Sequence, residues 1–217
     1  MEQLKMKENT TKGCLITFCG LDGCGKTTLI HILEKELNAR GKKVILTKQP
    51  TNAVRESEIF RAYMDSADHS QFDYRSLSLL AASDRIQHCA HVIEPALESG
   101  EIVISDRYFY SCLANLKARG FKEDKWIYEI SESIIKPDAA FFLDVPVDEA
   151  IRRVRMREDE KDRYIDVELQ YRLRNEYMSI CAQNDGIFMS TKDSIDELTK
   201  RVVDIILKKI SEKEVEK

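Results

Sequence analysis

The amino-acid sequence predicts an α/β fold with a five-stranded parallel sheet and helices on both faces. Two observations favour this fold. Short apolar runs alternate with helical patterns, which is typical of strand–helix units that build a covered parallel sheet. The chain has 217 residues, of which 43% are hydrophobic and 33% charged, enough to bury one core. We therefore expect a single domain over residues 1–217, with its core at about 13–210.

Five runs are expected to be the strands, because they are short and mostly β-branched or aromatic, as strands buried on both faces are. They are residues 14–19, 43–47, 102–105, 139–143 and 186–189. Seven helical patterns lie between and after them, several with a glycine just beyond the last turn. They are about residues 26–40, 74–99, 108–118, 125–134, 147–157, 167–183 and 195–209. The polar segment 49–72 shows only weak periodicity, and residues 211–217 are expected to be a frayed tail.

Charge, hydropathy and cysteine usage narrow the class of protein. With 34 basic and 38 acidic side chains, the net charge of −4 predicts no binding to a nucleic acid polymer or an anionic membrane. No run approaches the roughly 18 apolar residues of a spanning helix, and the polar start lacks a signal-peptide core. The six scattered cysteines form no CxxC motif, so they are expected to be reduced thiols, and the protein to be cytoplasmic.

A glycine-rich motif follows the first strand and opens the first helix. Residues 20–27 read G-x-x-x-x-G-K-T, and this pattern between a strand and a helix predicts a phosphate-binding loop, or P-loop. The glycines allow successive N–H groups to point at phosphate oxygens, and the helix N-terminus adds positive charge. Lys26 is then expected to reach the β- and γ-phosphates and Thr27 to offer a hydroxyl to Mg²⁺. The expected ATP-binding residues of this loop are Gly20, Leu21, Asp22, Gly23, Cys24, Gly25, Lys26, Thr27 and Thr28.

A P-loop alone does not distinguish kinases from GTPases and motor ATPases. The Asn-Lys-x-Asp motif with which GTPases read guanine is absent from the late strands. The strand at 102–105 is followed by Asp106 and Arg107, which predicts a carboxylate paired with a cation at a strand end facing the P-loop. A structural ion pair at the same place is the alternative.

The chain resembles thymidylate kinases over nearly its whole length. The resemblance is carried by six stretches: residues 18–28, 79–85 (LLAASDR), 106–108 with Ser111, 143–146, the arginine-rich turn 152–163 before Tyr164, and 175–177. It implies a three-layer P-loop kinase fold, phosphorylation of dTMP to dTDP by Mg·ATP, and a homodimer.

Transfer between two phosphates brings anions together, so catalysis depends on positioning and charge neutralisation more than on a general base. Arg107 is therefore the best candidate to hold the acceptor phosphate, and Asp106 would orient it or meet Mg²⁺ beside Thr27. Residues 152–165 resemble the lid of these kinases, in which a lid arginine serves when the P-loop has none; here the P-loop carries Gly23. The expected catalytic residues are Lys26, Arg107, Asp106, Asp22 and the unranked lid arginines Arg155, Arg157 and Arg163.

The resemblance also implies where the two nucleotides bind. Asp22 would meet the acceptor sugar and Arg85 the pyrimidine base. The acceptor site is expected to contain Asp22, Pro50, Ala81, Arg85, Arg107, Ser111 and Asn115. After the last strand, Thr191, Lys192 and Asp193 would line the adenine site, although a plain loop explains them equally well.

The nucleoside pocket departs from the family pattern. Ala81 stands where a phenylalanine usually stacks on thymine, and Asn115 where a tyrosine often closes against the sugar. One interpretation is a thymidylate kinase whose pocket is filled differently, by Phe72, Tyr74 or Tyr110. A second is a kinase for another nucleoside monophosphate. A third, from a different class, is a non-catalytic nucleotide-binding module.

Overall fold

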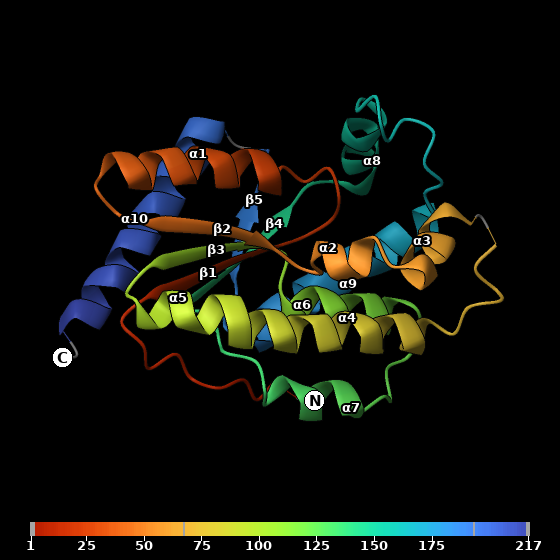
Figure 1. Cartoon of the computed structure of the whole chain (residues 1–217). Helices are drawn as coiled ribbons and strands as arrows, with labels where there is room; N and C mark the ends of the chain where they lie inside the picture. Colours follow the sequence, from red (N-terminus) through yellow and green to blue (C-terminus); the bar gives the residue numbers. More distant parts are fainter. Residues whose placement is uncertain (1–2, 67, 193, 216–217) are drawn as a thin grey trace.

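The structure is a computed structural model that describes residues 3–66, 68–192 and 194–215 (Figure 1). Within these residues, five strands form one parallel sheet in the order β2-β3-β1-β4-β5. They are β1 (Cys14–Cys19), β2 (Val44–Lys48), β3 (Ile102–Asp106), β4 (Ala139–Asp144) and β5 (Ile187–Ser190). The predicted fold class is confirmed, and each strand begins within one residue of its predicted start.

Helices cover both faces of the sheet. In Figure 1, α1 and α10 lie on one face, and α4, α5, α6 and α9 on the other. The helices are α1 (Lys26–Ala39), α2 (Asn52–Arg55), α3 (Glu58–Asp65), α4 (Tyr74–His88), η1 (Cys89–Ile93), α5 (Glu94–Glu98), α6 (Phe109–Ala118), α7 (Trp126–Ser131), α8 (Val147–Arg155), α9 (Val167–Gln183) and α10 (Ile195–Val215). Among the residues described, no helix is long and apolar enough to cross a membrane.

The strand register aligns the carboxyl ends of β1, β2 and β3. β1 and β3 are buried along their whole length, and Phe18 of β1 and Lys48 of β2 both lie opposite Asp106 of β3. The carboxyl ends of these three strands therefore meet at one edge. Ligands of open parallel sheets bind outside this edge, and Figure 1 shows α2, α3 and α8 at the same end of the molecule.

The structure differs from the predicted elements in two helices. The single helix expected at 74–99 contains one π-helical turn, η1, between α4 and α5. α10 continues to Val215, so the frayed tail is wrong for residues 211–215. Lys213 explains the extension, because its Nζ pairs with Asp138 at 2.9 Å and donates to the carbonyls of Asn9 and Gly13 at 3.1 and 3.0 Å.

The segment 49–72, for which no element was predicted, contains α2 and α3. α2 has four residues and α3 eight, lengths at which hydrophobic periodicity gives little signal. α3 buries only Tyr63 among its residues. Tyr63 contacts Phe72 and Tyr74 and accepts a hydrogen bond from Arg119. A local sequence pattern does not reveal such tertiary contacts, which stabilise short helices.

A buried histidine links β2 to α4. The Nε2 atom of His88 lies 2.7 Å from Thr47 Oγ1, and its Nδ1 atom 3.0 Å from Gln49 Nε2. Because an amide nitrogen only donates, Nδ1 accepts and Nε2 carries the hydrogen of a neutral ring. Burial lowers the pKa of His88, and the charge of Asp84 opposes this shift. The protonated ring therefore fits the fold poorly.

We expect the free energy of unfolding to fall as the pH drops below about 6.5, the ordinary pKa of histidine, because the unfolded chain then binds a proton that the fold resists. Protonation of His88 should account for part of this fall in the free energy of unfolding. Urea denaturation at pH 7.5 and 5.5 should show a smaller loss for His88→Gln than for the unsubstituted chain. The exposed His91 offers the control, since His91→Gln should keep the full loss. An equal loss in both variants would contradict the assignment.

Candidate active site

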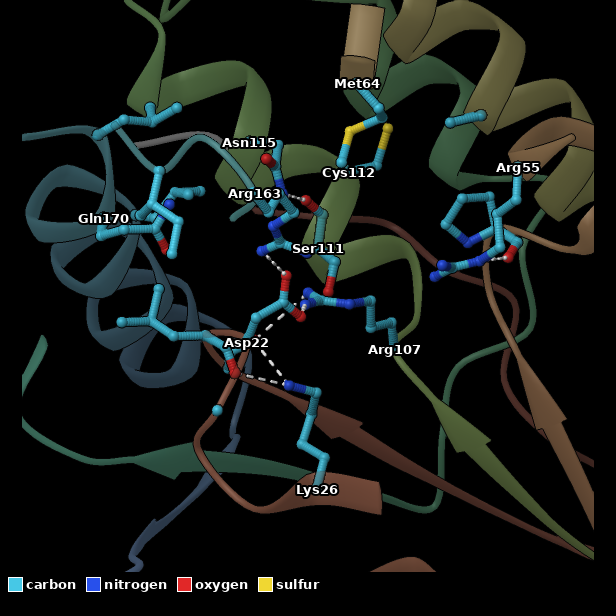
Figure 2. A pocket seen from close by; sticks show the side chains of 18 of the residues that line it. Asp22, Lys26, Arg55, Met64, Arg107, Ser111, Cys112, Asn115, Arg163 and Gln170 are labelled. Atoms are coloured by element: carbon cyan, nitrogen blue, oxygen red, sulfur yellow. Dashed lines mark hydrogen bonds and ion pairs between the residues drawn. The ribbon is translucent and has the colours of Figure 1, made fainter. Parts of the chain in front are cut away.

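A cleft opens at the carboxyl edge of the sheet (Figure 2). Its walls come from the P-loop, the ends of β2 and β3, one side of α3, α4 and α6, the lid segment after α8 and the start of α9. The predicted residues that line it are Gly20, Leu21, Asp22, Gly23, Gly25, Lys26, Thr27, Thr28, Pro50, Ala81, Arg85, Asp106, Arg107, Ser111, Asn115, Arg157 and Arg163. The fold therefore gathers most of the candidate residues into one place.

The P-loop has the backbone that its glycines predict. Gly20, Gly23 and Gly25 have φ angles of 139°, 82° and 96°, values that L side chains rarely adopt. Lys26 is the first residue of α1 and is buried. Its Nζ donates to the Leu21 and Gly20 carbonyls at 2.8 and 3.1 Å. The ammonium group thus lies inside the loop, where phosphates would be held.

Gly23 packs against the helix that leads into the lid. A Cβ atom on Gly23 would lie 2.2 Å from the carbonyl oxygen of Ala150 in α8. No side chain fits there without moving the α8 backbone. An arginine at this P-loop position is therefore sterically excluded, and the positive charge has to come from elsewhere in the cleft.

Arg107 forms an ion pair with Asp22 of the P-loop (Figure 2). The predicted pair with the neighbouring Asp106 is wrong, since Asp106 instead pairs with Lys48 and accepts from Thr27. Arg107 Nη2 lies 2.5 Å from Asp22 Oδ1, and Nη1 donates to the Tyr177 hydroxyl at 3.1 Å. Burial opposes the charge of the Asp22 carboxylate, but the cations of Arg107, Lys26 and Arg163 outweigh it and hold its pKa well below the usual range. Asp22 is thus an anion at any physiological pH.

The backbone of Arg107 is itself unusual. Its φ angle is 69°, a left-handed conformation that costs free energy in a residue with a side chain. Its N–H donates to the Phe18 carbonyl at 2.8 Å, so the end of β1 holds this conformation. The turn aims the guanidinium at the P-loop instead of along the strand.

The three lid arginines have different positions. Arg163 reaches the P-loop, with Nη2 3.2 Å from Asp22 Oδ2 and Nη1 2.9 Å from Glu160. Arg157 lines the cleft and pairs with Glu160 at 3.1 Å. Arg155 lies outside the cleft lining, and its Nη1 donates to the Lys161 and Arg163 carbonyls. Arg155 therefore holds the lid backbone, and of these three arginines Arg163 is the one bonded to the P-loop residue Asp22.

Thr27 and Asp106 fit the Mg²⁺ role predicted for them. The Thr27 hydroxyl donates to Asp106 Oδ2 at 3.2 Å, and Asp106 Oδ1 is buried without a hydrogen-bond partner. Within the described ranges, no group of three or more His, Cys, Asp or Glu could hold a metal by itself. Mg²⁺ usually keeps several waters and binds through one or two protein oxygens plus substrate phosphates, which suits this pair.

The end of the cleft predicted to take the acceptor contains a buried guanidinium. Arg85 is 3% exposed, its Nη1 donates to the Ala81 carbonyl at 2.9 Å, and its buried Nε has no partner. A buried donor without an acceptor is costly. It therefore points to a ligand that supplies a carbonyl or phosphate oxygen.

Several cleft residues were not identified from the sequence. Arg55 of α2 donates from Nε to the Pro50 carbonyl at 2.8 Å, and burial, followed by the charge of Arg107, lowers its pKa. Lys48 lies 3.9 Å from Asp106. Cations that crowd together in this way form an anion site. Other missed lining residues include Phe60, Tyr63, Met64, His69 and Arg119.

Of the three aromatic residues expected to fill the pocket, only Tyr74 lines it. Phe72 packs edge-on against Tyr63 with ring centroids 5.5 Å apart, behind the lining. Tyr110 is wrong as a filler, because it is buried against Phe142 at 5.5 Å. Ser111, Cys112 and Asn115 of α6 line the cleft, whereas Tyr110 packs against Phe142 of β4.

Of the expected adenine-site residues, the two that the structure describes, Thr191 and Lys192, do not line the cleft. Thr191 donates its N–H to the Asp144 carbonyl at 2.9 Å, and the Lys192 N–H lies 3.3 Å from Ser190 Oγ. Asp193 lies outside the described residues. Cys24 is fully buried, with its sulfur 3.5 Å from Lys26 Nζ. The role of Thr191 and Lys192 in ATP binding stays a prediction.

A P-loop that faces an arginine-rich lid across an acceptor cleft defines the class of P-loop nucleoside monophosphate kinases. The thymidylate kinase family model matches residues 18–202. A probable thymidylate kinase of Thermococcus gammatolerans is 34% identical over 204 residues, 91% of this chain and 98% of the relative. A probable thymidylate kinase of Pyrococcus horikoshii is 34% identical over 90% of this chain and 96% of the relative. One of Sulfurisphaera tokodaii is also 34% identical, over 88% of this chain and 94% of the relative. The chain belongs to the thymidylate kinase family.

Proposed function

We propose that this enzyme transfers the γ-phosphate of ATP to dTMP, giving dTDP and ADP. The observation that carries the proposal is the cluster in which Asp22 of the P-loop is bonded to both Arg107 and the lid residue Arg163. This cluster lies in the same cleft as the P-loop Lys26 and the buried Arg85. Phosphate and base recognition are thereby combined in one cleft.

In the proposed reaction an oxygen of the acceptor phosphate bonds to the γ phosphorus, and the bond from that phosphorus to the bridging oxygen of ADP breaks. The acceptor phosphate has a second pKa of about 6, so it is already largely ionised and no protein base is needed. Arg107 and Arg55 would hold the acceptor phosphate, and Lys26 and Arg163 would stabilise the transferring group. When bound, Mg²⁺ neutralises phosphate charge, and Thr27 with Asp106 would hold it.

A second candidate function is phosphorylation of another nucleoside monophosphate, and Ala81 and Asn115 favour it. A stacked aromatic is worth about 1–3 kcal/mol per base, so its absence at Ala81 would weaken the preference for thymine unless other residues replace it. The non-catalytic binding module is a third candidate. The paired Arg107 and Asp22 argue against it, because a binding switch does not need the acceptor-side cations.

We expect dTMP to be the preferred acceptor, because Arg85 offers a buried unpaired donor to a base carbonyl. ADP release with Mg·ATP should be measured against dTMP, dUMP, UMP, CMP, AMP and GMP. Preference for another monophosphate would support the second candidate. Absence of turnover with every acceptor would support the binding module.

We also propose that the enzyme is a cytoplasmic homodimer. Its six cysteines are free buried thiols, as in proteins of reducing compartments. Leu79 of α4 and Val92 of η1 are apolar and 47% and 42% exposed, and contact with a second copy would bury such side chains. A monomeric mass in solution would contradict the dimer.

A further inference from the structure

Beyond Ala81, the wall of the cleft includes three side chains that belong to none of the sequence motifs described above. Arg119 follows the last residue of α6, Tyr63 belongs to α3 and Tyr74 opens α4. All three line the same cleft as Ala81 and Arg85. We propose that Arg119 is a specificity residue that reads a carbonyl oxygen of the acceptor base, an inference that rests on the proposed function.

The guanidinium of Arg119 is fixed on three sides. Its carbon atom lies 3.8 Å from the centroid of the Tyr74 ring. Its Nε donates to the Tyr63 hydroxyl at 3.2 Å, and its Nη1 donates to the Asn115 side-chain oxygen at 2.8 Å and carbonyl at 3.1 Å. A donor held this firmly is preorganised, so little conformational entropy is lost when a ligand binds.

Asn115 acquires a role in this arrangement. Its amide nitrogen donates to the Ser111 carbonyl at 2.9 Å, and its amide oxygen accepts from Arg119. Both ends of the amide are therefore engaged within the protein. Asn115, one of the two residues that depart from the family pattern, therefore positions Arg119.

One part of Arg119 is free for a ligand. Over the described ranges, Arg119 has no carboxylate partner, and no hydrogen bond involves its Nη2 amino group. Arginine is a donor only, so Nη2 can bond to a carbonyl oxygen of a base and cannot accept from an exocyclic amino group. Together with the unpaired Nε of Arg85, the cleft presents two donors to the base.

Two fixed donors select a pyrimidine with two carbonyl groups, such as thymine or uracil, against cytosine, which presents an amino group at one of these positions. The neighbouring aromatic wall includes Tyr63 stacked on His69 at 4.1 Å and offers ring faces that Ala81 does not. The surface formed by Tyr63, Tyr74 and Arg119 would thus contact the base in place of a side chain at residue 81 of α4.

The test is the ratio of kcat/KM for dTMP to that for dCMP, measured in the unsubstituted enzyme and in Arg119→Gln and Arg119→Lys. A hydrogen bond to a charged group contributes enough for about a 10- to 100-fold effect, so both variants should lose about that much of the ratio. The KM for dTMP should rise while the KM for ATP changes little. Arg119→Lys keeps the charge but loses the fork, and it keeps the test valid should the Gln variant not fold.

Arg75→Gln is the matched control. Arg75 also lies over an aromatic ring, 4.3 Å from the centroid of Phe121, and bonds to Asp124, but it lies outside the cleft lining. Arg75→Gln should therefore keep the dTMP to dCMP ratio of kcat/KM found for the unsubstituted enzyme. If the unsubstituted enzyme prefers dTMP and both Arg119 variants keep that preference within about twofold, the inference is overturned and the proposed function stands. If the unsubstituted enzyme does not use dTMP at all, the proposed function itself fails.

Discussion

Lys26→Ala should lower kcat for phosphoryl transfer by about 10²- to 10³-fold, the loss that follows removal of one preorganised charge-stabilising group. The ammonium lies inside the P-loop, and among the described residues its hydrogen-bond partners are the Leu21 and Gly20 carbonyls and the Cys24 sulfur. It can exchange these neutral acceptors for phosphate oxygens without giving up an ion pair. The transition state would therefore lose its nearest fixed cation.

The measurement is single-turnover ADP formation at saturating Mg·ATP and dTMP, which separates chemistry from nucleotide binding. Lys35→Ala provides a matched control, because Lys35 is an exposed lysine of the same helix, α1. That variant should retain the kcat of the unsubstituted enzyme. A decrease of less than about tenfold in Lys26→Ala would contradict the role assigned to Lys26.

Arg163→Ala is expected to lower kcat by a comparable factor, about 10² to 10³. Arg163 is the lid arginine that contacts the P-loop carboxylate Asp22, and no arginine fits at Gly23 to take its place. Its loss would also leave Asp22 with one cation fewer. We expect the KM for dTMP to change less than kcat, because the contribution of Arg163 is greatest when charge develops on the transferring phosphoryl group.

Two other lid arginines make this test selective. Arg152 pairs with Glu149 on the outer side of α8 and does not line the cleft, so Arg152→Ala should have nearly unchanged kinetics. Arg155→Ala removes the bonds to the Lys161 and Arg163 carbonyls and should have a smaller effect than Arg163→Ala, through a looser lid. A larger loss in Arg155→Ala than in Arg163→Ala would reverse the order that the geometry gives.

The sheet and the P-loop could be predicted because their signals are local. A buried parallel strand is a short apolar run, and the loop Gly20–Thr27 is defined by consecutive residues. The sequence also places Asp106 and Arg107 at a strand end beside the P-loop, but it does not predict their partners, which are Asp22 for Arg107 and Lys48 for Asp106. In contrast, the order of the lid arginines depends on a contact between Arg163 and Asp22, which are 141 residues apart.

The acceptor wall could not be predicted for a related reason. α2 and α3 are short, and their structure is set by what they cover, so Arg55 and Tyr63 carry no periodic signal. Arg119 occupies a polar helix end where an exposed arginine would be ordinary. Only the fold shows that it lies over Tyr74 and is held by Asn115.

The close approach of Gly23 to Ala150 couples the P-loop to the helix that carries the lid. With an added Cβ atom only 2.2 Å from the Ala150 carbonyl, a mutation that placed an arginine in the P-loop would first displace α8, the helix that carries the lid. Gly23→Arg would therefore disturb the lid as well as the P-loop, so this single substitution should not replace the lid arginine as the source of positive charge. Moving this charge to the P-loop by design requires rebuilding residues 23 and 147–165 together.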